Sequence, residues 1–166
     1  MATELAGEIR DRVALNLDLC IDCRSCSAAC FYGHGQRPAL HFGTAGPATL
    51  PVVCRQCRDA WCVAACPNGA MRRSDAGVVY RSVVQCCGCG SCAVACPFGV
   101  VSLEMRHGEV AKCDLCHDIL GNGTEPRCVA SCPSGALRFM DESAAKDMGL
   151  VVLGSRTLGE HPIFRR

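Results

Sequence analysis

Residues 86–97 read CCGCGSCAVACP, and the cysteine spacing of this stretch recurs along the chain. Four of its cysteines follow the pattern C-x2-C-x2-C-x3-C, with Pro97 directly behind the last. Consecutive C-x2-C steps bend a loop around a metal centre while backbone N–H groups point at the sulfur atoms. Gly88 and Gly90 leave room for this bend, and the proline ends the short helical turn before it. The stretch therefore predicts a loop that wraps a metal-sulfur group.

The 17 cysteines of the chain form four such groups, with Cys87 left over. The second group has four residues between its second and third cysteines, and the fourth group has eleven. A proline follows the last cysteine of every group except the first, where Phe31 stands instead. In chain order the groups are Cys20, Cys23, Cys26, Cys30; Cys54, Cys57, Cys62, Cys66; Cys86, Cys89, Cys92, Cys96; and Cys113, Cys116, Cys128, Cys132.

Two other uses of cysteine compete with iron-sulfur ligation. Disulfide frameworks suit small secreted domains, but residues 1–19 show no export signal, and closely spaced cysteines make poor structural bridges. Structural zinc uses two C-x2-C pairs separated by a longer stretch, and the fourth group alone would suit such a site. The C-x2-C-x2-C triplets do not suit zinc, because a triplet surrounds one face of a 4Fe-4S cube and sends the fourth cysteine to another cluster.

A structural repeat follows the Cys-Pro pairs. The stretches after the second and third groups predict polar hairpins over residues 71–81 and 101–112, the latter turning at 107–108. The stretch after the fourth group predicts a short strand over 137–140. Each unit thus consists of a cysteine loop, a helical turn, a glycine kink and a strand or hairpin.

This arrangement resembles the bacterial two-cluster ferredoxin, in which each motif gives three ligands to one cluster and its last cysteine to the other. With four motifs, over residues 15–140, it resembles the four-cluster iron-sulfur subunits of the dimethyl sulfoxide reductase type. Their relatives serve formate, carbon monoxide and hydrogenase systems and tungsten aldehyde oxidoreductases. The resemblance implies four 4Fe-4S clusters, held by Cys20, Cys23, Cys26 with Cys132; Cys30 with Cys113, Cys116, Cys128; Cys54, Cys57, Cys62 with Cys96; and Cys66 with Cys86, Cys89, Cys92.

The same resemblance implies an α+β fold of tandem, nested ferredoxin-like units, with short β-hairpins and short helices wrapped around the clusters. Residues 1–53 and 110–140 would form an outer two-cluster unit, and residues 54–109 an inner one. The four clusters would then lie in a row that crosses the molecule. Residues 141–166, which include the apolar run 150–153, would form a C-terminal extension that docks a partner.

The function indicated is electron transfer without catalysis. Thiolates close every metal position, and neither G-x-G-x-x-G nor G-x-x-x-x-G-K-[ST] occurs, so no open coordination site or phosphate loop is expected. The resemblance implies a catalytic partner subunit with a molybdenum or tungsten pterin, such as an aldehyde oxidoreductase, and a second redox subunit with a flavin or a cluster. The alternative is a free polyferredoxin that diffuses between enzymes, and end-to-end stacking into a filament is a further hypothesis.

Charge and hydropathy exclude two classes of partner. The formal charge is +1 and the basic residues are scattered, which gives no basis for nucleic-acid binding. No apolar window reaches the length of about 18 residues that a membrane span needs, and the lack of a signal favours the cytoplasm. Arg24, Arg55 and Arg58 lie within cysteine motifs, where they would offset the charge of roughly −2 on each oxidised cluster.

Five side chains near the motifs invite special roles, and plainer roles are expected for most of them. Cys87 is expected to be a small buried residue. His117 is expected to donate a hydrogen bond near a cluster or to lie at the surface, and Trp61 to shield a cluster from water. His34 and His41 lie in the stretch between the first two cysteine groups, which is expected to be a solvated loop or a docking surface.

Overall fold

The structure is a computed structural model and describes residues 8–36, 39–45, 48–102, 110–120 and 124–154. It consists of short helices and short strands, as expected. In chain order the elements are β1 (Asp11–Leu15), α1 (Ser25–Gly33), β2 (His41–Ala45), β3 (Ala48–Val52), α2 (Trp61–Ala64), β4 (Met71–Arg73), β5 (Val79–Arg81), α3 (Ser91–Val94), α4 (His117–Leu120), α5 (Arg127–Ala130), β6 (Leu137–Asp141), α6 (Glu142–Asp147) and β7 (Val151–Leu153).

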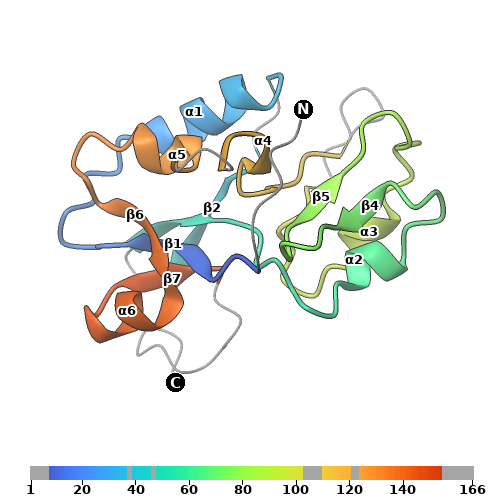
Figure 1. Cartoon of the computed structure of the whole chain (residues 1–166). Helices are drawn as coiled ribbons and strands as arrows, with labels where there is room; N and C mark the ends of the chain where they lie inside the picture. The colour runs from blue at the N-terminus through green and yellow to red at the C-terminus, as the bar shows by residue number, and fades with distance from the viewer. Residues whose placement is uncertain (1–7, 37–38, 46–47, 103–109, 121–123, 155–166) are drawn as a thin grey trace.

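Two lobes are visible in Figure 1. One lobe contains the sheet β6-β1-β7 with α1, α5 and α6, and so joins the two ends of the described residues. In it β1 pairs antiparallel with β6, from Asp11 opposite Asp141 to Leu15 opposite Leu137. The other lobe contains the hairpin β4–β5 with α2 and α3, all from the middle of the sequence. The polypeptide therefore starts in one lobe, forms the other, and returns.

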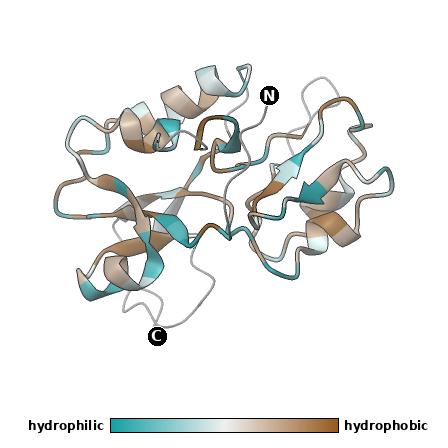
Figure 2. Ribbon diagram, viewed as in Figure 1, coloured by the Kyte–Doolittle hydropathy of each residue, from teal (hydrophilic) through white to brown (hydrophobic). Residues whose placement is uncertain are grey.

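The sheet of the first lobe is buried on both faces. Side chains alternate across a strand, so Val13 and Leu15 of β1 face one core while Ala14 between them faces another, where it meets Ala145 of α6. Strand β7 completes the sheet by pairing Val13 with Leu153 on the free edge of β1. Figure 2 shows hydrophobic and hydrophilic stretches alternating at short intervals along both lobes, so no long apolar element organises the core.

Cysteine side chains make up part of the main core of each lobe. The core of the first lobe includes the buried Cys30 and Cys128, and that of the second lobe includes the buried Cys92. The second core otherwise contains few large side chains, among them Met71 and Val110. Apolar packing of this size stabilises a fold only modestly, which fits a protein that depends on bound metal.

The repeat expected after the Cys-Pro pairs is present where the structure describes it. The hairpin expected over 71–81 is β4–β5, which pairs Met71 with Arg81, and the strand expected over 137–140 is β6. The expected glycine kinks occupy the left-handed backbone region, which glycine enters without steric cost, at Gly69, Gly99 and Gly135. The turn expected at 107–108 lies outside the described residues.

Two expectations about connecting segments were wrong. The stretch between the first two cysteine groups is not simply a loop, because β2 and β3 form a hairpin in it, with the buried Leu40 just before β2 and the buried Leu50 within β3. The apolar run 150–153 is not an exposed docking anchor, because Val151–Leu153 forms β7 and is buried against β1. Side chains that complete an internal sheet are not available to a partner. Residues 155–166 of the expected extension lie outside the described residues.

Among the helices of the described residues, none is long and apolar enough to cross a bilayer.

Candidate metal centres

Four cavities of similar size, with empty volumes of about 310 to 410 Å³, are each lined by four motif cysteines, and one of them also by Cys87. These quartets are the same as those implied by the ferredoxin resemblance, and what they bind stays a prediction. We number them as site 1 (Cys20, Cys23, Cys26, Cys132), site 2 (Cys30, Cys113, Cys116, Cys128), site 3 (Cys54, Cys57, Cys62, Cys96) and site 4 (Cys66, Cys86, Cys89, Cys92).

The exchanged cysteines of sites 1 and 4 are held by backbone N–H groups downstream of them. Cys66 accepts from Ala70 N at 3.2 Å and from Met71 N at 3.4 Å. Cys132 accepts from Leu137 N at the same offset along the sequence, at 3.5 Å. The glycine kink produces this geometry, because it turns the backbone toward the sulfur that precedes it. N–H groups aimed at sulfur stabilise thiolate charge, so the repeat builds an anion-stabilising loop at both positions.

The four sites are connected in the order 1, 2, 3 and 4. Sites 1 and 2 are neighbours because they share the first and fourth cysteine groups, and sites 3 and 4 share the second and third groups. Sites 2 and 3 meet where Cys54 and Cys113 approach each other, with the Cys54 N–H directed at the Cys113 sulfur. We therefore call sites 1 and 4 the end sites, and sites 2 and 3 the middle sites.

Exposure differs between the end sites and the middle sites. Each end site includes exposed cysteines, namely Cys20 and Cys23 in site 1 and Cys89 in site 4. None of the middle-site cysteines is exposed, and in site 2 three of the four are buried: Cys30, Cys116 and Cys128. Water and large reagents can thus approach the exposed sulfur atoms of the end sites directly, while the middle-site cysteines are partly covered at site 3 and mostly buried at site 2.

The environment of the middle sites opposes bare thiolates. Burial, followed by the charge of Cys54, raises the pKa of Cys113 to about 12. Burial also raises the pKa of Cys62 to about 11 and raises that of Cys128, which the neighbouring cysteines Cys113 and Cys116 raise further. Four buried sulfur atoms that repel one another as anions need a positive centre among them. The donor set and its surroundings therefore fit an iron-sulfur cluster.

Serine hydroxyls support the exposed cysteines of the end sites. In site 1, the Oγ of Ser25 lies 3.4 Å from the Sγ of Cys23, and in site 4 the Oγ of Ser91 lies 3.4 Å from the Sγ of Cys89. These hydrogen bonds are the main cause of the lowered pKa of Cys23 and Cys89. The correspondence reflects the C-x-S-C spacing that the first and third cysteine groups share.

A buried polar network joins the two middle sites. The side chains of Gln56 and Lys112 are 1% and 6% exposed. Gln56 Nε2 donates to the carbonyl of Cys113 at 3.1 Å, and Lys112 Nζ donates to the same carbonyl at 2.7 Å. Sequence reasoning missed both residues. The available signal was that Lys112 is one of only two lysines and directly precedes a cysteine motif.

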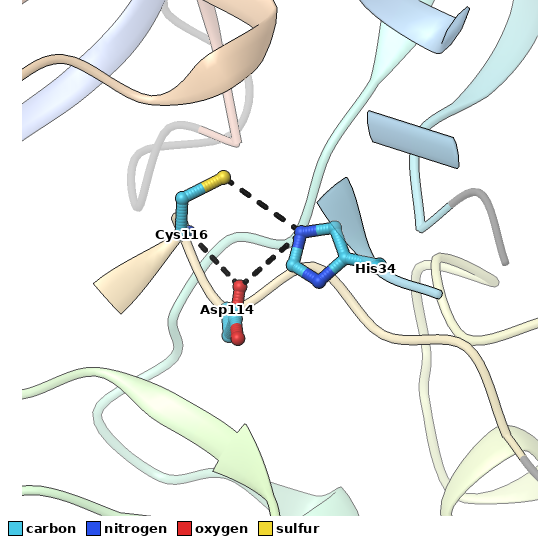
Figure 3. Close-up of side chains that lie close together, drawn as sticks. All are labelled: His34, Asp114 and Cys116. Carbon is cyan, nitrogen blue, oxygen red and sulfur yellow. Dashed lines mark hydrogen bonds and ion pairs between the residues drawn. The ribbon is translucent and has the colours of Figure 1, made fainter. Parts of the chain in front are cut away.

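His34 contacts a cysteine of site 2. Its Nε2 lies 3.7 Å from the Sγ of Cys116 and 3.7 Å from the Oδ1 of Asp114, as Figure 3 shows. The three side chains offer atoms close enough to hold a metal ion, but Cys116 also completes the site 2 quartet. When Nε2 carries the proton, it donates toward the Cys116 sulfur. His34 is thus the C-cap residue of α1 and contacts site 2 rather than lying free in solvent, and docking through this residue stays a prediction.

The arginines within the cysteine motifs take different positions. Arg55 is buried, lines site 3 and stacks over Phe98 at 4.0 Å from the ring centroid. Arg24 lines site 1 and lies over Phe42 at 5.3 Å. Arg58 is exposed and lines none of the four cavities. Two of the three are thus placed to offset charge at a site, while the third is not.

The remaining side chains singled out from the sequence are also placed. The expectation for Cys87 was wrong, because it is exposed, although it lines site 4 beside the quartet. His117 begins α4 and stacks on Tyr80 at 5.1 Å between ring centroids. Trp61 lines site 3 but is 66% exposed, so it covers the site from outside. His41 begins β2.

Comparisons with known proteins identify the family. Residues 47–142 match the family described as a 4Fe-4S dicluster domain. The protein is 33% identical over 156 residues to the electron transport protein HydN of Escherichia coli (strain K12), covering 78% of this sequence and 87% of HydN. It is 40% identical over 140 residues to the putative oxidoreductase UacF of the same strain, covering 78% of this sequence and only 21% of UacF.

A third relative is the B subunit of the anaerobic dimethyl sulfoxide reductase of Escherichia coli (strain K12), which is 40% identical over 90 residues. That match covers 54% of this sequence and 44% of the reductase subunit. The protein thus spans most of HydN, about a fifth of UacF and less than half of the reductase subunit.

Proposed function

Because this protein belongs to the 4Fe-4S dicluster domain family, we propose that it is an electron-transfer subunit that binds four 4Fe-4S clusters and relays single electrons between two redox partners. A dicluster domain accounts for two clusters. The gathering of all sixteen motif cysteines into four quartets of similar size supports the other two. This is the observation that carries the proposal.

The proposed ligands are the quartets of sites 1 to 4. A bound 4Fe-4S cluster accepts and returns one electron at a time. The cysteines of each motif are divided between two neighbouring sites, which fixes the separation within each pair. Backbone N–H groups, such as those of Ala70 and Leu137, hold negative charge at the sulfur atoms. Because no cysteine position is left for a substrate to bind metal, we propose that the protein is not itself catalytic.

The end sites are the proposed points of electron entry and exit. Apolar side chains lie exposed beside both: Leu19 and Ile21 next to Cys20 in site 1, and Val83 and Val84 before Cys86 in site 4. Exposed apolar groups favour protein contacts. The relative that is a subunit of dimethyl sulfoxide reductase supports a catalytic partner subunit with a molybdenum or tungsten pterin, an aldehyde oxidoreductase among the candidates. A flavin or cluster subunit would be the second partner.

A free polyferredoxin is the alternative. The apolar run 150–153 belongs to the protein's own sheet and is not an exposed anchor. It therefore no longer argues against a free carrier. Exposed end sites would also allow copies to stack end to end. No disulfide joins any of the 17 cysteines, and a cytoplasmic location is part of the proposal. Light scattering of concentrated protein tests stacking, and co-purification with a larger redox subunit favours the subunit role over the free carrier.

Metal analysis tests the proposal most directly. Anaerobically purified protein should be brown, carry about 16 irons and 16 acid-labile sulfides, and take up four electrons in a titration with a low-potential reductant. About half that iron would leave two clusters and refute the four-site relay. Stoichiometric zinc without colour would refute iron-sulfur binding altogether.

A further inference from the structure

Lys112 places a charged group inside the protein at the junction of the two lobes. It is 6% exposed, and lysine is almost never buried to this extent unless it is paired. It sits between β5 of one lobe and the cysteine motif that serves the other, since its Nζ donates to the carbonyls of Val79 and Cys113. Two carbonyls do not neutralise an ammonium group, so its counter-charge comes from elsewhere.

The counter-charge would come from clusters at both middle sites. The two carbonyl partners of Lys112 belong to Val79, which lines site 3, and to Cys113 of site 2. An oxidised cluster with four thiolates carries roughly −2. The same ammonium group therefore lies beside two sites that would each hold negative charge.

Gln56 closes a ring of hydrogen bonds around this contact. Its Nε2 donates to the Cys113 carbonyl that Lys112 also binds, and its Oε1 accepts from Val79 N at 2.6 Å. Val79 O in turn accepts from Lys112. Gln56 lies within the site 3 loop between Cys54 and Cys57, at a φ of 50°. The ring thus ties the site 3 loop, the site 2 loop and strand β5 together with no exposed member among its side chains.

The charge of Lys112 in this ring bears on the reduction potentials of the middle sites. Adding an electron to a buried site is costly, because a low-dielectric interior disfavours extra negative charge, and burial alone would lower the reduction potential of the middle sites relative to the end sites. A buried cation shared by both middle sites opposes that effect. We infer that Lys112 and Gln56 form a bridge that raises the reduction potentials at sites 2 and 3 together and fixes the spacing of their loops. The inference rests on the proposed binding of clusters at these sites.

Redox titration of the loaded, full-length protein, followed by electron paramagnetic resonance, tests the bridge. In Lys112→Met, two of the four midpoint potentials should fall. Each reduction equilibrium should change at least tenfold, and a tenfold change corresponds to about 59 mV for one electron. Ser25→Ala and Ser91→Ala identify the other two, because each removes a hydroxyl beside one end site. Lys146→Met is the matched control, since it removes the only other lysine, which lies on α6 paired with Glu142.

In Lys112→Met, only the midpoint potentials of the middle sites should fall. Lys146→Met should leave all four potentials nearly unchanged. Lys112→Arg keeps the charge and should retain the wild-type potentials. Four unmoved potentials in Lys112→Met, or an equal shift at all four sites, would overturn the bridge. If Lys112→Met does not take up all four clusters, its iron content tests the bridge. The bridge predicts that the clusters of sites 2 and 3 are lost together, which removes about half the iron. Loss of a cluster from site 1 or site 4 would overturn it. If wild-type protein holds four clusters and Lys112→Met changes no potential, the bridge is refuted and the proposed function is unaffected.

Discussion

The end sites and the middle sites are built from related cysteine motifs, with C-x2-C-x2-C triplets at the end sites and longer spacings at the middle sites, and they differ in exposure. Site 1 presents Cys20 and Cys23 to solvent, whereas site 2 buries Cys30 and Cys128. Because each cysteine motif serves one end site and one middle site, a single loop passes from an exposed to a buried environment within a few residues. The spacing sets which sulfur atoms meet, and the nesting of the two lobes sets how much water surrounds them.

The proposed relay requires that thiolate charge is compensated in both environments. Serine hydroxyls do so at the exposed Cys23 and Cys89, beside the cations Arg24 and Arg81 that line sites 1 and 4. At the middle sites the cations are Lys112 between them, Arg55 at site 3, and Arg127, which hydrogen bonds both Asp118 and Cys116 at site 2. Cations thus serve all four sites, and the end sites add hydroxyl donors.

The largest expected effect concerns removal of the metal. A chelator with a mild oxidant should strip the exposed end sites first, so that the brown colour falls in two phases of about equal size. The first phase should leave a folded protein, and the second should unfold it, because binding at metal-dependent domains supplies on the order of 10 kcal/mol of folding free energy. Iron content, visible absorbance and circular dichroism measured on the same samples follow both phases.

Two outcomes would contradict this order of loss. A single phase that removes all iron at one rate would mean that burial does not protect the middle sites. A cooperative thermal transition in metal-free protein would mean that the two small apolar cores hold the fold on their own.

Local patterns in the sequence predicted the parts of the fold that depend on local geometry. The quartets followed from spacing by resemblance, and the hairpin over 71–81, the strand over 137–140 and the kink at Gly69 followed from turn chemistry. A C-x2-C step or a glycine kink is decided by neighbours a few residues away. These features therefore needed no knowledge of how distant segments meet.

Most of the features that the sequence did not predict depend on distant segments, the local hairpin β2–β3 being the exception. Strand β7 forms only because β1 offers a free edge to Val151–Leu153. Gln56 and Lys112 become a network only when the two lobes meet, with Gln56 bonded to a residue 57 positions along the sequence. Cys87 is exposed because its neighbours belong to an end site rather than a core. Composition and spacing carry no signal for such long-range meetings.

A smaller effect is expected where β7 supports a middle site. Gly154 has a φ of 67°, and a Cβ there would lie 2.7 Å from the carbonyl oxygen of Cys54 and 3.2 Å from the Cα of Arg55. Gly154→Ala should therefore add overpacking of about 1–3 kcal/mol to the cost of the left-handed backbone, about 1–2 kcal/mol. Chemical unfolding of the loaded protein measures the change in the free energy of unfolding.

Gly149→Ala is the matched control for that substitution. Gly149 has a similar φ of 70°, but a Cβ there meets nothing within 4 Å. It should show only the backbone cost and leave site 3 unaffected. Equal destabilisation by both substitutions would mean that the contact of β7 with the Cys54 loop contributes nothing.

The smallest expected effect is at His34, and it separates the two middle sites from each other. A donor from Nε2 to the Cys116 sulfur stabilises the reduced, more negative state, so His34→Leu should lower one potential, that of site 2. The change should stay below tenfold in the reduction equilibrium, under about 59 mV, because the 3.7 Å contact is shared with Asp114. His41→Leu is the control, since His41 lines none of the four sites. A shift at both middle sites would assign the effect to the Lys112 bridge instead, and no shift would make His34 a packing residue.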